Sequence, residues 1–328
     1  MDGRASIQWT TWNCRSGLKE RVAGVEIMTK KKFQGTGTAL VTPFLRDGSI
    51  DEPALRRLVN HQIRGGIDML VPCGTTGEGA TLKPAEADRV LSIVVEETSG
   101  RALVIFGAGS NSTDTAVEGA RRALRLGADG VLSVGPYYNK PPQRGYVEHF
   151  RKVADVGCPV IVHNIPGRTG SNIEASTMLQ LAEVPNIAGV KESSGSLVQM
   201  MEIIRNRPPE FRVLAGDDYV ALALISVGGD GLISVISNEA PAMTSELVNS
   251  ALEGNFSRAR ELQYRLLPLM NANFVESNPI PVKAVLAMMG LIEENLRLPM
   301  MPLLPAHRAP LQKLAEELGL LQSVAAQR

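Results

Sequence analysis

The segment "IAGVKESSG", residues 187–195, places a lysine directly after an apolar run. A lysine at the end of a strand is ordinarily solvated, because charged side chains are rarely buried. Where apolar neighbours exclude water, however, desolvation lowers the pKa of the amine and leaves part of it neutral near pH 7. A neutral amine attacks a carbonyl to form a Schiff base, which turns the α-carbon of the substrate into an enamine nucleophile. Lys191 is therefore the candidate nucleophile.

Three further residues could bind the carboxylates of a substrate. Thr75 and Thr76 are flanked by glycines, which let the backbone approach a ligand so that amide N–H groups and threonine hydroxyls can hold an anion. The same stretch could also be an ordinary turn. Arg168 would by default be a surface residue, but beside a lysine nucleophile its guanidinium could clamp a second carboxylate through two parallel hydrogen bonds.

Proton transfer needs a group that both donates and accepts, and two segments offer one. Tyr137 and Tyr138 could be packing residues, but the chain has only five tyrosines, and a phenol at the mouth of a site can pass a proton to a substrate oxygen. His163 ends an apolar run in "IVHNIPGRTG", residues 161–170. A lone strand-end histidine usually has a structural role, whereas an imidazole with a reference pKa of about 6.5 can also carry protons at neutral pH.

Together these residue types indicate a class I aldolase or a related lyase. One imine-forming lysine and one carboxylate site favour a 2-oxo acid such as pyruvate as the donor substrate. Metal-dependent chemistry is not expected, because the four histidines show no HxH or HExxH spacing and the three cysteines form no CxxC pair. No cofactor is predicted.

The hydrophobic pattern predicts how the chain brings these residues together. From residue 35 onward, short β-branched runs alternate with amphipathic segments whose apolar residues recur every three or four positions. The predicted strands are Gly37–Val41, Met69–Cys73, Leu103–Gly107, Gly130–Val134, Val160–Asn164, Ala188–Lys191, Arg212–Ala215 and Gly231–Ser234. The predicted helices are Glu52–Arg64, Pro84–Thr98, Ser112–Leu126, Arg144–Val156, Glu174–Ala182, Leu197–Arg205, Asp217–Val227 and Ala240–Leu252, followed by Ser257–Phe274, Pro281–Met289 and Ala309–Leu320.

Eight strands that are each followed by a helix predict an α/β fold, a closed (β/α)8 TIM barrel with a C-terminal all-helical appendage. An open doubly wound sheet is less favoured, because residues 74–79 do not form a G-x-G-x-x-G fingerprint. The expected parts are a catalytic barrel over residues 33–254 and a helical region over residues 255–328. Residues 1–32 are predicted to be a disordered or mis-started N-terminal extension. In a barrel the active site lies at the carboxyl ends of the strands.

Composition narrows the possible partners. The chain has 34 Lys and Arg against 34 Asp and Glu, and a net charge of zero argues against nucleic acid or an anionic membrane surface as the main partner. No apolar run approaches the roughly 18 residues that a membrane span needs. The odd number of cysteines favours a reducing compartment, and hence a cytoplasmic location.

Several segments resemble the dihydrodipicolinate synthase family, within the superfamily of pyruvate-dependent class I aldolases and N-acetylneuraminate lyases. The resemblance implies a cofactor-independent lyase of lysine and diaminopimelate biosynthesis, which condenses pyruvate with L-aspartate 4-semialdehyde. It also implies a cytoplasmic homotetramer built from tight dimers. The similar segments run from about Phe33 to Leu320 and include "GTTGEGATL", "PYYNKPPQRG", "NIPGRTG", "GVKESSG", "AGDD" and "VESNPIPVKAVLAMMGL".

The same resemblance implies residue roles. Lys191 condenses with pyruvate, while Thr76 and the adjoining backbone amides hold the pyruvate carboxylate. Arg168 binds the carboxylate of the semialdehyde. Thr75 and Tyr138 belong to a proton relay, with a tyrosine supplied across a tight dimer interface. The residues that would shape the pocket are Gly216 and Ile233.

His163 departs from the family pattern, which places a tyrosine before N-[IV]-P-x-R-T-G. We expect His163 to replace that tyrosine as proton carrier and to add an acid limb to the pH–rate profile at about pH 6–7. The substitution leaves two alternatives open, an aldolase acting on a sugar acid of the N-acetylneuraminate or 2-keto-3-deoxygluconate type, and a catalytically silent barrel. Retention of Arg168 favours the small amino-acid aldehyde.

Feedback inhibition by lysine is expected to be weak or absent. Thr115 and Ala87 stand where the inhibited relatives carry an acidic residue and an imidazole or aromatic ring. Without the carboxylate, a bound lysine ammonium loses a charge-assisted hydrogen bond worth about 1.5–3 kcal/mol.

Overall fold

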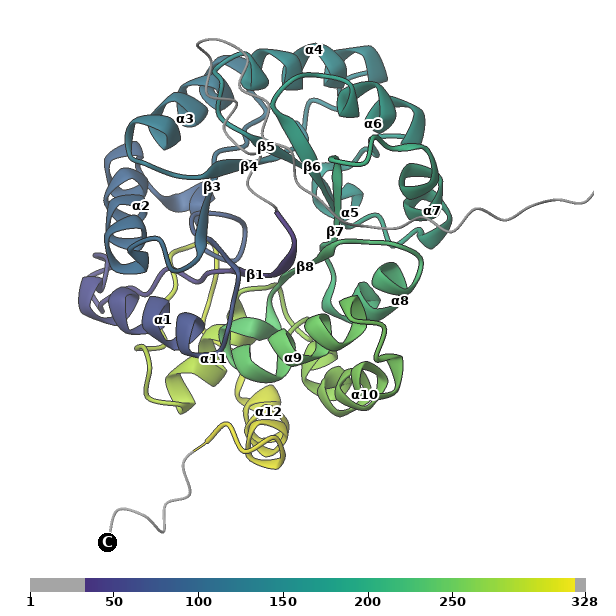
Figure 1. The fold of residues 1–328 in the computed structure, drawn as a ribbon. Coiled ribbons are helices and arrows are strands. Elements are labelled where there is room, and N and C mark those ends of the chain that lie inside the picture. The colour runs from purple at the N-terminus through teal and green to yellow at the C-terminus, as the bar shows by residue number, and fades with distance from the viewer. Residues whose placement is uncertain (1–32, 322–328) are drawn as a thin grey trace, which may run out of the picture. The chain divides into compact units, whose positions relative to one another are not determined.

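The computed structural model describes residues 33–321, so the predictions for residues 1–32 lie outside the described residues. Eight parallel strands pair in chain order, and β1 also pairs with β8. The predicted (β/α)8 barrel with C-terminal helices is therefore confirmed (Figure 1). The strands are β1 Gly35–Ala39, β2 Met69–Val71, β3 Leu103–Gly107, β4 Gly130–Val134, β5 Val160–Asn164, β6 Ile187–Glu192, β7 Arg212–Ala215 and β8 Gly231–Ser234.

Helices follow the strands and surround the barrel (Figure 1). Local sequence sets where they begin; the Asp51 carboxylate, for example, accepts a hydrogen bond from the Ala54 amide at 3.0 Å and caps the first helix. The helices of the barrel are α1 Glu52–Arg64, α2 Pro84–Thr98, α3 Thr113–Arg125, α4 Gln143–Ala154, α5 Pro166–Thr169, α6 Ala175–Ala182, α7 Leu197–Asn206, α8 Ala221–Ser226 and α9 Pro241–Leu252. Those after the barrel are α10 Phe256–Ala272, α11 Ile280–Met288 and α12 Pro305–Glu317.

The strands are buried on both faces. Ile105, Ile161 and Leu214 belong to an apolar cluster inside the barrel, to which Phe33 also contributes. Val131 and Val162, on the other face, belong to the cluster that packs under the helices. Burial on both sides explains why the strands read as nearly continuous apolar runs. Because the interior is a packed core, a ligand can be bound only at an end of the barrel.

The predicted helix Asp217–Val227 is wrong in its first turn. Residues Asp218–Val220 form a 3-10 turn, η2, and α8 begins only at Ala221. The cause is the carboxylate of Asp218, which accepts hydrogen bonds from the amides of Val235 at 3.1 Å and Ile236 at 3.2 Å. These contacts hold the turn against the loop after β8 and prevent it from continuing the helix.

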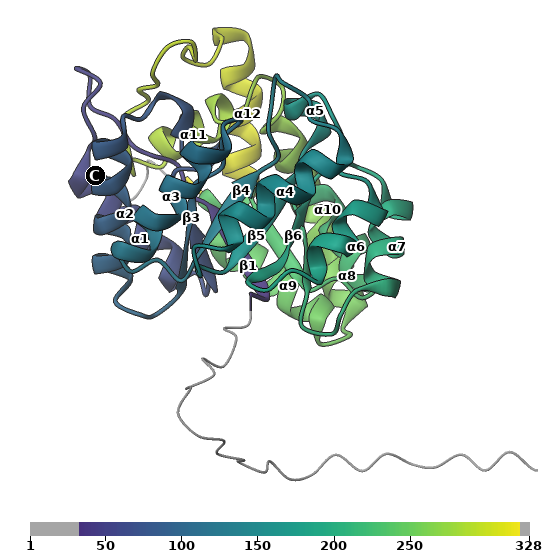
Figure 2. The same ribbon diagram turned by 90° about the horizontal axis from the view of Figure 1, so that it is seen from above.

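The C-terminal helices reach the end of the barrel where the strands end. Figure 2 shows α11 and α12 at the same end of the barrel as α5, which directly follows β5. The amine of Lys283 on α11 donates a 2.5 Å hydrogen bond to the carboxylate of Glu78 in the loop after β2. The appendage therefore contacts a loop that carries predicted site residues. Across the part of the chain that the structure describes, no helix has the length and apolar character to span a bilayer.

Candidate active site

Lys191 is a buried amine near the carboxyl end of β6. The residue is only 7% exposed. Burial lowers the pKa of the amine to about 8, although the carboxylates of Asp217 and Asp218 oppose this effect. Among residues 33–321, no hydrogen-bonding partner lies within reach of the amine. The predicted nucleophile is therefore desolvated, partly neutral at pH 7 and free to react.

Gly216, just after β7, lies beside this lysine. A Cβ atom at this position would lie 3.0 Å from Cε of Lys191 and 1.7 Å from Oγ of Ser193. No side chain can occupy that space unless Ser193 moves. The missing side chain of Gly216 thus lets the hydroxyl of Ser193 approach the buried amine, and the role of Gly216 in shaping the pocket stays a prediction.

Thr76 is buried in the loop after β2, whereas Thr75 beside it is exposed. The hydroxyl oxygen of Thr76 accepts a hydrogen bond from Nδ2 of Asn278 at 2.9 Å. Since the amide is the donor in this contact, the hydroxyl proton of Thr76 remains available for an acceptor. That arrangement suits the binding of a carboxylate.

Arg168 is an exposed residue on α5, and like Thr76 it forms a hydrogen bond with Asn278. Nη2 of Arg168 donates a hydrogen bond of 3.4 Å to the backbone carbonyl of Asn278. Asn278 thereby contacts both predicted carboxylate-binding side chains, one through its amide and one through its main chain. Sequence reasoning missed this residue, although the segment "VESNPIPVK" that contains it was singled out.

His163 ends β5 and pairs in register with Lys191 on β6. It is 4% exposed, and its Nε2 lies 3.4 Å from Oγ of Ser193. Burial, together with the positive charges of Lys191 and Arg168, keeps the pKa of the imidazole well below 6.5. The lowered pKa favours the neutral ring at pH 7 in the free protein. It would place an acid limb from His163 below the expected pH 6–7, and the limb itself stays a prediction.

The structure does not bury Tyr138 with Lys191 and Thr76 in its own chain. Tyr138 is 89% exposed and takes a positive φ of 72°. Tyr137 is also exposed. A hydrogen bond of 2.9 Å from the side chain of Asn139 to the carbonyl of Asn111 ties this loop to the one after β3. The predicted tyrosine of the relay is thus presented outward.

Ile233 lies on β8 and is fully buried in the apolar cluster inside the barrel. Its Cγ1 would lie 3.3 Å from a Cβ atom at Gly37 on the neighbouring strand. Ile233 therefore belongs to the packed interior of the barrel, where it can support the site from within.

A second buried lysine anchors the loop that carries Thr76. Besides Glu78, the amine of Lys283 donates to the carbonyl of Asn295 at 2.9 Å and lies 4.3 Å from the ring centroid of Phe44. The other carboxylate oxygen of Glu78 accepts a hydrogen bond from the amide of Arg297 at 3.0 Å. Sequence reasoning missed this anchor, because Lys283 lies within a helix and only contacts distant in sequence show that it is buried.

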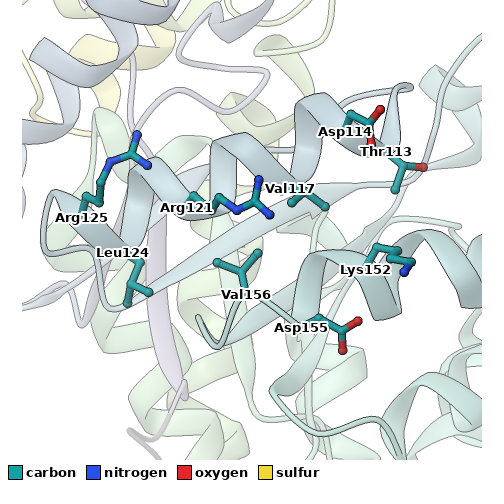
Figure 3. Close-up of a pocket in the computed structure, with 9 residues that line it drawn as sticks. All are labelled: Thr113, Asp114, Val117, Arg121, Leu124, Arg125, Lys152, Asp155 and Val156. Carbon is teal, nitrogen blue, oxygen red and sulfur yellow. The ribbon is translucent and has the colours of Figure 1, made fainter.

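A hollow on the outer surface lies away from these residues. It runs between α3 and α4, with Arg121 and Arg125 on one side and Lys152 and Asp155 on the other (Figure 3). None of the predicted site residues lines it. Among residues 33–321, no group of three or more His, Cys, Asp or Glu side chains is placed to hold a metal ion.

The chain is similar to known proteins over most of its length. The model of the Dihydrodipicolinate synthetase family matches residues 32–318. A 4-hydroxy-tetrahydrodipicolinate synthase of Koribacter versatilis is 52% identical over 294 residues, which cover 89% of this chain and 98% of the relative. Dihydrodipicolinate synthase from Aquifex aeolicus superposes with a TM-score of 0.87 at 41% identity, covering 89% of this chain and 100% of that one. The enzyme from Acinetobacter baumannii, solved with pyruvate, gives a TM-score of 0.86 at 40% identity, covering 88% and 99%.

Proposed function

The chain belongs to the dihydrodipicolinate synthetase family. We propose that the reaction of this family takes place at the mouth of the barrel and that Lys191 is the amine that binds pyruvate. The chain is a lyase of lysine and diaminopimelate biosynthesis, which condenses pyruvate with L-aspartate 4-semialdehyde to give 4-hydroxy-tetrahydrodipicolinate. One observation supports the assignment of Lys191 above the others, namely a buried amine without a hydrogen-bonding partner among residues 33–321, whose pKa is lowered to about 8.

The steps follow from the chemistry of an amine and a 2-oxo acid. Nζ of Lys191 attacks the keto carbon of pyruvate, and loss of water gives a protonated Schiff base. Loss of a methyl proton then yields the enamine, whose carbon attacks the aldehyde of the semialdehyde. The aldehyde oxygen takes up a proton and becomes a hydroxyl. Finally the amino group of the second substrate attacks the imine carbon, which closes the ring and releases Lys191.

The surrounding residues bind and orient the two substrates. The hydroxyl of Thr76 donates to the pyruvate carboxylate, because its oxygen already accepts from Asn278. Arg168, exposed at the mouth, binds the carboxylate of the semialdehyde. Gly216 lets Ser193 lie close to Lys191, and Ile233 packs in the barrel interior.

Proton transfer uses Thr75, Tyr138 and His163. An 89% exposed Tyr138 is suited to serve the site of a second copy of the chain, so we propose a homotetramer of tight dimers in which this tyrosine completes the neighbouring site. His163 replaces a phenol as the buried proton carrier.

A cytoplasmic location is in keeping with the free, buried thiols of Cys73 and Cys158. Weak or absent inhibition by lysine stays a prediction.

The test is to trap the Schiff base. The full chain is incubated with pyruvate, reduced with borohydride and digested, and the adduct is located by mass spectrometry. We expect one reduced pyruvate adduct, on Lys191, and turnover when the semialdehyde is added. Lys191→Arg is the matched control, since it keeps the positive charge and removes the primary amine. An adduct on another lysine, or turnover of N-acetylneuraminate or 2-keto-3-deoxygluconate instead of condensation, would overturn the proposal.

A further inference from the structure

The hydroxyl of Ser193 lies next to both His163 and the reactive lysine. Its oxygen is 3.4 Å from Nε2 of His163. The Cβ atom that Gly216 lacks would collide with this oxygen at 1.7 Å and would lie 3.0 Å from Cε of Lys191. Ser193 therefore contacts the imidazole on one side and borders the space beside the amine on the other.

The backbone around Ser193 is held on two sides, which fixes where its side chain leaves the chain. The amide of Ser193 donates to the carbonyl of Asn164 on β5 at 2.8 Å, and the carbonyl of Glu192 accepts from the amide of Gly216 at 2.9 Å. The carboxylate of Glu192 accepts in turn from the amide of Ser194 at 2.8 Å. A hydroxyl placed in this way needs little reorganisation to take part in a reaction.

His163 and Ser193 differ in their exposure to solvent. His163 is buried, whereas Ser193 is half-buried. A substrate bound to Lys191 can thus reach the hydroxyl more readily than the ring behind it. Passing a proton through the hydroxyl would also extend the reach of an imidazole, which is shorter than a phenol.

The charges around His163 define what the pair can do. Burial lowers its pKa most, followed by the positive charges of Lys191 on β6 and Arg168 on α5, and its partner on β4 is the apolar Val134. The imidazole is therefore neutral before the reaction. Once the protonated Schiff base forms, its positive charge disappears again when a methyl proton leaves. A proton received by His163 at that step replaces a charge that has just been lost, so the total charge of the pocket does not change.

We propose that Ser193 and His163 form one proton-carrying pair, in which the serine hydroxyl links the buried imidazole to the substrate on Lys191. This inference rests on the proposed function. In the first step a methyl C–H bond of the Schiff base breaks, its electrons form the C=C bond of the enamine, and the C=N π electrons move to nitrogen. The proton passes to Oγ of Ser193 while the serine proton moves to Nε2 of His163.

The second step reverses the direction of transfer. When the enamine carbon bonds to the aldehyde, the C=O π electrons move to oxygen, and that oxygen takes the proton of Ser193. The serine recovers its proton from His163, which becomes neutral as the iminium forms again. Atoms and charge balance in both steps without a further reactant.

Exchange of the pyruvate methyl protons in deuterated water isolates the first step. We expect Ser193→Ala to lower the exchange rate followed by NMR by about 100-fold, in the range of a lost acid–base group, while borohydride still traps pyruvate on Lys191. Ser193→Thr keeps a hydroxyl and should recover most of the rate. Ser194→Ala, in the same loop, is the matched control and should exchange like the unaltered chain.

A double variant tests whether the two residues act as one unit. Ser193→Ala, His163→Gln and their combination should show similar losses, because either change interrupts the same path. Losses that multiply in the combination, or exchange at the normal rate in Ser193→Ala, would overturn the pair. Loss of trapping in Ser193→Ala would also overturn it, since Ser193 would then serve imine formation. Failure of trapping in the unaltered chain would instead refute the proposed function.

Discussion

Lys191 and Lys283 are both buried, one at the barrel mouth and one in the C-terminal helices. Burial lowers the pKa of each amine to about 8. Lys283 is enclosed by the carboxylate of Glu78 at 2.5 Å, the carbonyl of Asn295 at 2.9 Å and the ring of Phe44. Lys191 has no hydrogen-bonding partner among residues 33–321. A lowered pKa therefore does not by itself mark a nucleophile.

The surroundings of the amine decide between the two roles. A carboxylate in contact with a buried ammonium compensates its lost hydration, so Lys283 serves as a structural ion pair. Lys191 lacks such a contact, and only the Coulombic attraction of Asp217 and Asp218 opposes the effect of burial on its charged form. The same absence leaves the lone pair of its neutral form free to attack a carbonyl. Variants of both lysines and the pH dependence of imine capture can sharpen or break this distinction.

The largest effect is expected from Lys191→Met. Without an amine there is no Schiff base, so the rate of condensation should fall by at least about 1,000-fold, as for the loss of other nucleophiles. Because burial lowers the pKa from 10.5 to about 8, removing the amine should also raise the free energy of unfolding at pH 7, by up to about 3 kcal/mol. Activity and urea denaturation measure the two effects. A variant that is both inactive and destabilised would contradict the account of an unpaired amine.

Lys283→Met should give the opposite pattern. It leaves Glu78 as an uncompensated buried charge, so the free energy of unfolding should fall by about 3–5 kcal/mol. The folded fraction should still form the pyruvate adduct on Lys191. The double variant Glu78→Gln/Lys283→Met removes both charges and should regain most of the stability, as seen by urea denaturation. Equal stability of the single variant and the unaltered chain would show that the ion pair contributes nothing.

The sequence predicts one of these lysines and misses the other for a physical reason. Lys191 follows an apolar run at the end of a predicted strand, and in a barrel the carboxyl ends of the strands form the face that carries the active site. Lys283 lies on a helix, and its partner Glu78 is 205 residues away in the chain. No local pattern reports such a contact. The eight strands were predictable because each is short, apolar and bounded by turns.

The limits of sequence reasoning also appear at two predicted site residues. His163 was recognisable from its place directly before "NIPGRTG", but its pKa depends on burial and on the charges of Lys191 and Arg168, which only the fold brings together. The hydroxyl of Thr76 was recognisable beside its glycines, but its donor Asn278 comes from the C-terminal region. In both cases the sequence predicts which residue takes part, and contacts across the fold determine its charge and orientation.

The pH dependence of imine capture tests the unpaired state of Lys191. With a pKa of about 8, the neutral fraction of the amine rises about tenfold from pH 6 to pH 7 and levels off above the pKa. The rate of borohydride-trapped adduct formation at low pyruvate concentration should follow this curve. A second inflection at pH 6–7 would contradict the neutral state of His163. Asp217→Asn removes a carboxylate that raises the pKa of Lys191, so it should move the curve to lower pH.

The smallest effect is expected at Asn278, which connects the C-terminal helices to the catalytic end of the barrel. Asn278→Ala removes the donor to Thr76 and keeps the backbone carbonyl that accepts from Arg168. Loss of one hydrogen bond of about 1–1.5 kcal/mol should raise KM for pyruvate about five- to tenfold. KM for the semialdehyde should change less, since Arg168 keeps its partner.

Asn278→Asp tests whether the side chain of residue 278 orients the hydroxyl of Thr76 or only fills space beside it. The carboxylate is nearly isosteric with the amide, but it accepts where the amide donates. The carboxylate would accept a hydrogen bond from the hydroxyl of Thr76, which then no longer donates to pyruvate, and it would place a negative charge near the bound carboxylate of pyruvate. Pyruvate binding should therefore be weaker in Asn278→Asp than in Asn278→Ala, although the side chain is better preserved. If Asp binds pyruvate as well as Asn does, the amide does not orient Thr76, and the C-terminal helices contribute to stability without assisting substrate binding.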